Sequence, residues 1–325
     1  MSNRLYGPLA DAAGEAGHPE GHPPRMGFFT DTSVCIGCKA CEVACKEWNL
    51  VPEDGLNLLG TSYDNSGELS ANTWRHVAFV EQVRPRREPV ELGMPATGPP
   101  GGQAAAQHDR DVRWLMMSDV CKHCTHAACL DVCPTGSLIR TEYATVVVQE
   151  DICNGCGYCV PACPYGVLSI REGDGRAWKC TLCYDRLRDG HEPACAQACP
   201  TDSIQFGPLE ELQQRADRRL EQLQARGVQE ARLYGRDPDD GVGGDGAFFL
   251  LLDEPEVYGL PPEPIVPTRN LASIWGAAAA AAGLLAVGVA LACTGTTRRT
   301  GSGGSEPSSS CSTSRRCTAC RRIPS

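Results

Sequence analysis

Sixteen cysteines arranged in four groups of four are the feature that most constrains this chain of 325 residues. The first and third groups have the spacing C-x2-C-x2-C-x3-C, the second lengthens one gap to four residues, and the fourth lengthens one gap to eleven. A proline follows the last cysteine of three groups, at Pro134, Pro164 and Pro200. Only 6% of the residues are aromatic, so large aromatic side chains cannot fill most of the core. We therefore expect groups bound by cysteine to organise the fold.

This spacing is typical of proteins that bind iron-sulfur clusters. Three thiolates two residues apart can hold one face of a cubane, while the fourth cysteine of C-x2-C-x2-C-x3-C-P ligates the other cluster of a pair. The groups are therefore expected to work in twos. The second and third groups are separated by about twenty residues, as in a two-cluster ferredoxin. The first and fourth groups are left to pair with each other.

The crossing of the fourth cysteines gives four predicted cluster sites, numbered here 1 to 4. Site 1 comprises Cys35, Cys38, Cys41 and Cys199. Site 2 comprises Cys121, Cys124, Cys129 and Cys163. Site 3 comprises Cys153, Cys156, Cys159 and Cys133, and site 4 comprises Cys180, Cys183, Cys195 and Cys45. Because every predicted ligand is a cysteine, we expect four 4Fe-4S clusters, and we expect no catalytic residue in this chain.

Zinc and disulfides are the alternative uses of so many cysteines. Structural zinc usually takes two separated C-x2-C pairs, or cysteine with histidine, and does not need the C-x2-C-x2-C-x3-C-P run. Disulfides between cysteines this dense in short loops would be strained. A zinc-stabilised interaction protein is therefore the less favoured alternative. A colourless protein that carries zinc, without iron or sulfide, would establish it.

A lysine stands beside a predicted ligand at four positions: Lys39, Lys46, Lys122 and Lys179. Such a lysine can raise the reduction potential of a nearby cluster or contact a partner. A lysine beside a loop is more often simply solvated, and this is the expectation for all four.

The predicted fold class is α+β, with two ferredoxin-like two-cluster modules, one inserted in the other. Residues 28–83 and 172–207 form the outer module, and residues 112–171 form the inner one. Short strands are expected at Trp74–Val83 and Thr145–Val148, which are rich in β-branched and aromatic residues. A helix is expected to begin at Pro208 and end before Gly227, within a connecting segment of residues 208–270. The GVGG sequence of this segment is expected to form a turn, because a strand-like AFFLLL follows it where a dinucleotide fingerprint needs a helix.

Three further segments are expected to lie outside the modules. Residues 1–27 are predicted to form an N-terminal arm, residues 84–111 a mobile insertion rich in Pro, Gly and Ala, and residues 298–325 a basic, disordered tail. The last 28 residues contain six arginines and one glutamate, so a chain of net charge -10 carries -15 before Arg298. A body this acidic repels phosphate backbones, and nucleic-acid binding is not expected.

Residues 271–297 contain no charged side chain, and about 20 helical residues are enough to cross a bilayer core. We predict a single transmembrane helix here, with a buried Ala-rich helix as the alternative. Arg298 and Arg299 follow the helix, which places the C-terminus in the cytoplasm and the cluster modules on the outer face of the cell membrane. The N-terminal sequence has no ordinary secretory signal, so export is expected to depend on a partner.

With these groups placed, the chain resembles the iron-sulfur beta subunit of membrane-bound respiratory formate dehydrogenases, within the four-cluster electron-transfer subunits of molybdopterin oxidoreductases. The resemblance is carried by VCIGCKACEVACKEWN, LSANTWRHVAF, CNGCGYCVPACPYG, WKCTLCYDRL and EPACAQACPT. The downstream sequences RLYG, GVGG and EVYGLPPEP resemble formate dehydrogenase more specifically. The insertion at residues 84–111 and the Arg/Ser/Cys tail depart from the family pattern.

The resemblance implies a chain that is not itself an enzyme and that transfers electrons within a formate dehydrogenase complex. It implies a catalytic alpha subunit, whose molybdopterin cofactor holds molybdenum or tungsten and which oxidises formate to carbon dioxide. It also implies a cytochrome b gamma subunit that passes electrons to quinone, and a twin-arginine signal on the alpha subunit that exports both chains. The alternative keeps the electron-transfer role but changes the partner to a hydrogenase or another molybdopterin reductase.

Overall fold

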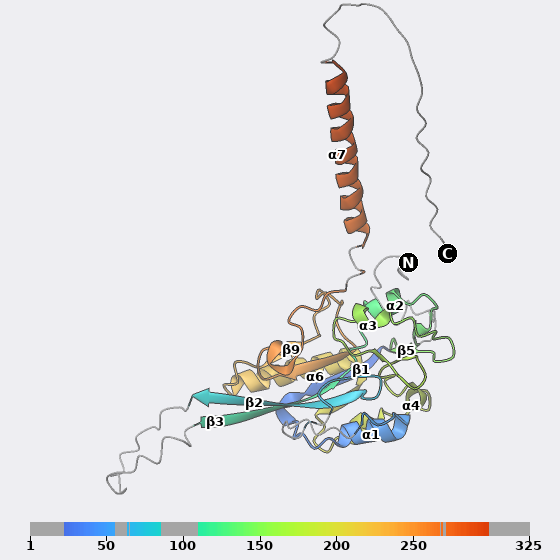
Figure 1. Cartoon of the computed structure of the whole chain (residues 1–325). Helices are drawn as coiled ribbons and strands as arrows, with labels where there is room; N and C mark the ends of the chain where they lie inside the picture. Colours follow the sequence, from blue (N-terminus) through green and yellow to red (C-terminus); the bar gives the residue numbers. More distant parts are fainter. Residues whose placement is uncertain are drawn as a thin grey trace, which may run out of the picture. The chain divides into compact units, whose positions relative to one another are not determined.

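The computed structural model describes residues 23–55, 64, 66–85, 110–266, 268 and 271–298 (Figure 1). The chain divides into two compact units, Met1–Arg269 and Asn270–Ser325. Its elements are, in order, β1 Met26–Asp31, η1 Thr32–Val34, α1 Ala40–Asn49, β2 Arg75–Pro85, β3 Arg110–Val120, α2 Ala128–Asp131, β4 Leu138–Arg140, β5 Val146–Val148, α3 Cys159–Ala162, β6 Ser169–Ile170, β7 Ala177–Trp178, α4 Tyr184–Arg188, α5 Ala194–Gln197, β8 Ile204–Pro208, α6 Leu209–Ala225, β9 Arg232–Tyr234, β10 Ala247–Leu251, η3 Pro255–Tyr258 and α7 Leu271–Arg298. The α+β class is as predicted.

A four-stranded sheet in the order β8-β1-β10-β9 forms the middle of the first unit. β1 pairs with β10 in parallel and with β8 in antiparallel orientation. Every residue of β10 is buried, and successive side chains of a strand point to opposite faces. Accordingly Phe248 and Leu250 pack in the cluster that contains α6, whereas Phe249 and Leu251 pack in the cluster that contains the cysteines. The sheet therefore separates α6 from the cysteine-bearing core.

Helix α6 confirms the prediction of a helix in this segment, although it begins at Leu209, one residue after the predicted start at Pro208. Glu210 and Glu211 lie in its first turn, where acidic side chains favour the positive end of the helix dipole. Leu212 and Ala216 are buried against the sheet. The helix ends at Ala225, two residues before the predicted stop at a glycine. α6 covers one face of the sheet, and the cysteine loops pack against the other face.

Strands β2 and β3 form a long antiparallel ribbon (Figure 1). The ladder runs from Arg75 opposite Val120 to Pro85 opposite Arg110, so β2 continues two residues beyond the predicted end of the strand. Residues 86–109 of the predicted insertion lie outside the described residues. β2 precedes these residues and β3 follows them. One ladder therefore pairs the end of the predicted outer segment with the start of the predicted inner segment.

The N-terminal end of the described chain is attached to the body. The side chain of Arg25 donates to Thr125 Oγ1 at 2.7 Å and to the carbonyl oxygen of His123 at 3.2 Å, and β1 begins at Met26. The prediction of an arm that extends to residue 27 is therefore wrong for its last residues, because strand pairing and these hydrogen bonds hold them. The preceding residues 1–22 lie outside the described chain, as do residues 299–325 of the predicted tail.

The GVGG segment forms the predicted turn. The carbonyl oxygens of Val242 and Gly244 accept hydrogen bonds from the backbone nitrogens of His126 at 2.8 Å and Thr125 at 3.0 Å. Gly243 has a φ of 75°, and a Cβ there would lie 2.3 Å from the ring of His126. Only glycine tolerates both conditions. The turn thus packs against the second cysteine group, and β10 follows it.

Helix α7 contains a stretch from Ser273 to Ala292 that is long and apolar enough to cross a membrane. None of these 20 residues is buried, which differs from the alternative of a buried Ala-rich helix. This agrees with the predicted membrane anchor.

Candidate functional site

The first cysteine loop connects η1 to α1 and turns twice through the left-handed region. Gly37 has a φ of 65° and Lys39 a φ of 59°, a conformation that suits glycine far better than other residues. These two turns curl the chain between Cys35 and Cys41. A Cβ on Gly37 would lie 2.7 Å from the sulfur of Met116, so the loop also packs too closely for a side chain at that position.

The thiols predicted for site 1 surround one cavity, which is lined by Cys35, Cys38, Cys41 and Cys199. Cys41 is buried and its Sγ lies 3.2 Å from the hydroxyl oxygen of Ser118 on β3. Cys38 is exposed at the surface. The structure therefore brings Cys199, from the fourth group, to the loop of the first group.

The thiols predicted for site 2 surround a second cavity, lined by Cys121, Cys124, Cys129 and Cys163. His123 also lines it. The imidazole Nδ1 of His123 accepts the backbone N–H of Val146 at 3.0 Å, so the proton of the neutral ring is on Nε2. Burial and then the charge of Lys179 lower the pKa of His123, which keeps the ring neutral.

The Nε2 atom of His123 is buried and has no hydrogen-bond partner within the described part of the chain. A buried donor without an acceptor is costly. Sulfur atoms of an iron-sulfur cluster accept hydrogen bonds, and such bonds tune the cluster. Four thiols and an unpaired donor around one cavity therefore fit a bound 4Fe-4S cluster.

The thiols predicted for sites 3 and 4 also lie together. Asn49 Nδ2 is 3.8 Å from Cys45 Sγ and 3.7 Å from Cys183 Sγ, which places the crossing cysteine of site 4 beside its predicted partner. Burial raises the pKa of the Cys159 thiol to about 11, and the charges of three further thiols add to this rise. They belong to Cys133, Cys153 and Cys156.

The donor set suits a cluster better than a single ion. All sixteen cysteines are free of disulfides. In the described ranges, no three His, Cys, Asp or Glu side chains are close enough to hold one metal ion. The thiols of sites 1 and 2 instead line cavities, as expected for a polynuclear cluster with thiolate ligands.

Thiols of different sites approach one another at three places. At each place two thiols from different sites form a pair. Burial raises the pKa of one thiol of the pair, and the charge of the other thiol raises it further. The pairs are Cys41 with Cys195 for sites 1 and 4, Cys180 with Cys121 for sites 4 and 2, and Cys129 with Cys159 for sites 2 and 3. These neighbouring thiols favour the order 1, 4, 2, 3 for the predicted sites. The two end sites each contain an exposed cysteine, Cys38 and Cys156.

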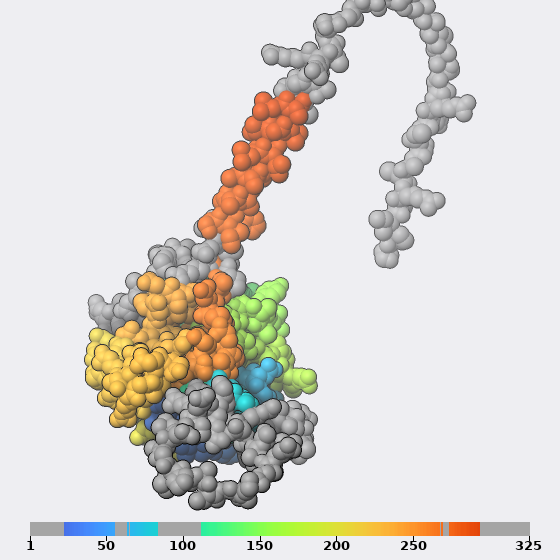
Figure 2. All heavy atoms as spheres, turned by 90° about the vertical axis from the view of Figure 1, so that its left-hand side faces the viewer, coloured from blue at the N-terminus to red at the C-terminus, as the bar shows by residue number. Residues whose placement is uncertain are grey.

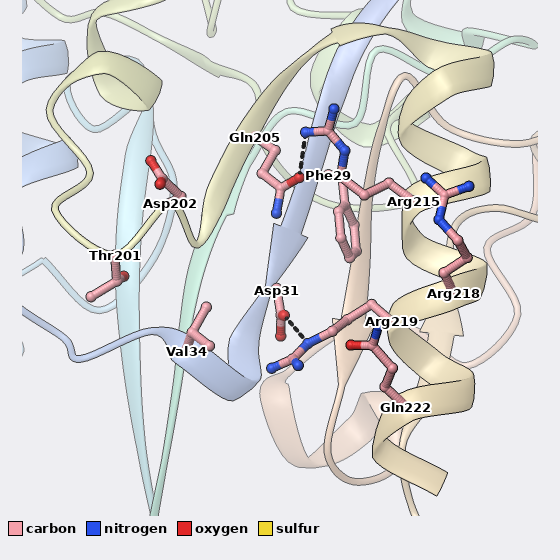
Figure 3. A pocket seen from close by; sticks show the side chains of 10 residues that line it. All are labelled: Phe29, Asp31, Val34, Thr201, Asp202, Gln205, Arg215, Arg218, Arg219 and Gln222. Carbon is pink, nitrogen blue, oxygen red and sulfur yellow. Dashed lines mark hydrogen bonds and ion pairs between the residues drawn. The ribbon is translucent and has the colours of Figure 1, made fainter. Parts of the chain in front are cut away.

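A separate hollow of about 340 Å³ lies between α6 and the end of β1. Figure 3 shows that Arg219 reaches Asp31 and that Arg215 reaches Gln205 across it. Asp31 caps η1 through the N–H of Ser33, and η1 leads directly into the site 1 loop. The Arg219 ion pair, at 2.8 Å, therefore ties α6 to the segment that positions the first cysteine.

Comparison with known proteins identifies the family. Residues 34–137 and residues 112–209 each match a family model described as a 4Fe-4S dicluster domain. The nitrate-inducible formate dehydrogenase iron-sulfur subunit of Escherichia coli K12 is 37% identical over 263 residues, which cover 79% of either protein. The chain belongs to the formate dehydrogenase iron-sulfur subunits. The formate dehydrogenase iron-sulfur subunit of Haemophilus influenzae is 40% identical over 248 residues, covering 75% of this chain and 70% of the relative.

More distant similarity extends to another reductase. The B subunit of the anaerobic dimethyl sulfoxide reductase of Escherichia coli K12 is 35% identical over 192 residues, covering 59% of this chain and 77% of the relative. The similarity to the formate dehydrogenase subunits is longer and stronger, which confirms the predicted family. These relatives are iron-sulfur electron-transfer subunits and not catalytic subunits.

The burial of the lysines beside the ligands differs from the prediction for two of the four. Lys39 and Lys46 are partly exposed, with side-chain exposures of 21% and 32%. Lys122 and Lys179 are buried, so the expectation that they are solvated is wrong. Lys122 pairs with Asp119 on β3. The sequence shows that Lys122 and Lys179 stand beside ligands, but it does not show that the β2–β3 ribbon and the cysteine loops cover them.

Two buried groups near the sites were missed by sequence reasoning. His123 lies inside a C-x2-C segment, and that position could have marked it as a neighbour of a cluster. Arg75 is buried at the start of β2, and a charged residue at a strand end gave no signal of this. Both become visible only when the ribbon and the cysteine loops are brought together.

Proposed function

We propose that this subunit passes electrons from a molybdopterin-containing formate dehydrogenase catalytic subunit, through four 4Fe-4S clusters, towards a membrane cytochrome b. The observation that carries the proposal is the unbroken series of four cysteine sets between two exposed ends, Cys38 and Cys156. The four predicted ligand sets are proposed as they stand. When bound, each cluster supplies a one-electron redox centre.

The residues of this chain hold, cover and orient these centres. The thiolates fix their positions, and the N–H of His123 is available to a sulfur at site 2. The sheet and α6 close one side of the core, which keeps the inner sites 4 and 2 away from water. Several thiols of these inner sites are buried, among them Cys121, Cys129, Cys180, Cys183 and Cys195.

The direction of transfer is supported by where the chain leaves the first unit. Thr268 Oγ1 donates to Asp131 Oδ2 at 2.6 Å, and Val266 packs with Ala162 of α3. In Figure 2 the orange segment that ends this unit lies beside the light green segment that contains α3. The last described residues of the first unit thus lie close to sites 2 and 3, and the chain continues from there into α7. We place site 3 towards the membrane and site 1 towards the catalytic subunit.

Exposed apolar side chains flank both end sites and favour protein contacts there. Ile36 and Val43 are exposed beside site 1, and Ile152 and Tyr158 beside site 3.

The inner two-cluster module is proposed to be inserted in the outer one, with sites 2 and 3 inside and sites 1 and 4 outside. The proposed topology has a single membrane span, with the C-terminus in the cytoplasm and the cluster unit exported together with the catalytic subunit.

A second candidate keeps this role in a different molybdopterin reductase. This candidate is supported by the similarity to the B subunit of dimethyl sulfoxide reductase, which extends over 192 residues. The formate assignment is preferred because 263 residues align with the formate dehydrogenase subunit, so the match extends beyond the segment that contains the cysteines.

The proposal is tested by purifying the membrane complex through this chain, identifying the chains that accompany it, and measuring formate-dependent reduction of a dye. We expect a molybdopterin protein, formate-dependent activity, and iron and sulfide in the complex. A partner that oxidises or reduces only another substrate would refute the formate assignment. A colourless subunit with zinc and no iron would refute the cluster assignment.

A further inference from the structure

Arg75 and Lys179 are cations that lie almost completely buried in the cysteine-bearing core without a carboxylate partner among the described residues. Arg75 and Lys179 have relative exposures of 2% and 1%. Among the described residues neither makes an ion pair with an aspartate or glutamate. Lys122, which is buried just as deeply, pairs with Asp119 and so differs from these two. Burial of a charge is strongly unfavourable unless an opposite charge lies nearby.

Arg75 lies between sites 1 and 4. Its Nη2 is 3.2 Å from the Sγ of Cys195, a ligand of site 4. Its Nη1 donates to the carbonyl oxygen of Ser118 at 3.2 Å and approaches the Ser118 hydroxyl at 3.3 Å. That hydroxyl is 3.2 Å from the Sγ of Cys41, a ligand of site 1. A short chain of contacts through Arg75 therefore joins the two sites.

Electrostatics agree with this placement. Burial alone would lower the pKa of Arg75, but the charges of Cys195, Cys41 and Cys180 raise it above its usual range. The guanidinium stays charged at any ordinary pH. Its Nε is buried and has no hydrogen-bond partner in the described part of the chain, so it too is available to a sulfur.

Lys179 occupies the corresponding place between sites 4 and 2. It directly precedes Cys180, and its Nζ donates to the carbonyl oxygen of that residue at 2.8 Å and to the carbonyl oxygen of Val146. It also lines the cavity of site 2. The indole rings of the preceding residues, Trp74 and Trp178, stack with centroids 6.1 Å apart. Two Trp-cation pairs thus stand side by side, one at each junction.

We propose that Arg75 and Lys179 are fixed positive charges that raise the reduction potentials of the clusters on either side of them. This inference rests on the proposed binding of clusters at the four sites. A cluster held by four thiolates is an anion and gains one more negative charge when it accepts an electron. A nearby buried cation stabilises the reduced form more than the oxidised form, because screening in the core is weak. Charge is a recognised determinant of cluster potential.

The arrangement predicts a pattern across the four sites. Arg75→Met should lower the potentials of sites 1 and 4, and Lys179→Met should lower those of sites 4 and 2. Site 4 is flanked by both cations, so it should respond to either change and most strongly to both together. Site 3 touches neither cation and should keep its potential.

The test is a redox titration of the purified complex followed by electron paramagnetic resonance. Each signal is assigned to its site by the ligand variants Cys38→Ala, Cys124→Ala, Cys156→Ala and Cys183→Ala. Arg75→Met is expected to disfavour reduction of site 4 about tenfold or more, which is about 59 mV for one electron. Lys179→Met should give a shift of similar size at the same site.

Lys46→Met is the matched control. It removes a positive charge beside Cys45, a ligand of site 4, but Lys46 pairs with Asp54 at 2.8 Å and is partly exposed. Its removal should leave every potential within the error of the titration. Arg75→Lys and Lys179→Arg retain the charge and should restore most of the lost potential. A structural role in packing would not follow the charge in this way.

The outcomes separate this inference from the function on which it rests. If the wild-type complex shows no set of 4Fe-4S signals, the proposed function fails. If the signals are present but neither Met variant shifts site 4, or if site 3 shifts as much as site 4, only the inference is overturned. Should Arg75→Met lose its clusters, Arg75→Gln keeps hydrogen-bond donors without the charge, and its site 4 potential decides the matter in the same way.

Discussion

The assignment of Cys163 to site 2 can be tested by counting iron. Cys163 belongs by sequence to the third cysteine group, but its thiol lines the cavity of Cys121, Cys124 and Cys129. Cys163→Ala should therefore remove the cluster of site 2 and cost the complex about four iron atoms. Adding Cys124→Ala should remove nothing more, because both residues serve the same cluster. Adding Cys156→Ala instead should remove a second cluster, for a total loss of about eight iron atoms.

The two double variants are each other's control, since both contain Cys163→Ala and one further cysteine substitution. The measurement is iron and acid-labile sulfide per purified complex, compared with the unsubstituted complex, so iron in partner subunits cancels. The reasoning is refuted if Cys163→Ala with Cys156→Ala loses about four iron atoms and Cys163→Ala with Cys124→Ala loses about eight. That result would return Cys163 to the cluster of its own sequence group.

Three further substitutions test the parts of the fold that position the sites. Arg219→Ala removes the ion pair to Asp31 and should lower the free energy of unfolding by about 2 kcal/mol. Arg215→Ala, which removes an exposed hydrogen bond to Gln205, is the control. If both variants lose the same stability, the ion pair does not have the role given to it. Gly37→Ala forces a left-handed residue into a site without room for a Cβ and should cost site 1 its iron, about four atoms; full iron content would show that the loop adapts. Leu212→Ala, in the packed face of α6, should lower the midpoint of urea unfolding by an amount equivalent to about 3 kcal/mol without changing iron content. A smaller loss would mean that α6 contributes little to the core.

The spacing of the cysteines allows the sites to be predicted, because the chemistry of a cluster dictates that spacing. Four thiols must meet, and short loops with a glycine such as Gly37 can bring three of them together locally. The amphipathic pattern of α6 likewise follows from a single rule of burial. These features depend on a few neighbouring residues, which is why the sequence alone reveals them.

Features that depend on distant partners were not predictable in this way. The ribbon of β2 and β3 pairs residues on both sides of a long insertion, and no local pattern reports that pairing. β10 lies parallel to β1 although more than two hundred residues separate them in the chain. The burial of Arg75 and Lys179 follows from these long-range contacts, because the same side chains on isolated segments would be solvated.

The most direct test of the proposed electron path is to interrupt it at either end and supply formate. Without the site 1 ligand, in Cys38→Ala, formate should no longer reduce the clusters of sites 4, 2 and 3, whereas a chemical reductant should still reduce them. Without the site 3 ligand, in Cys156→Ala, formate should reduce sites 1, 4 and 2 but should no longer reduce quinone. Reduction of sites 4, 2 and 3 by formate at the unsubstituted rate in Cys38→Ala would contradict the series of sites on which this account depends.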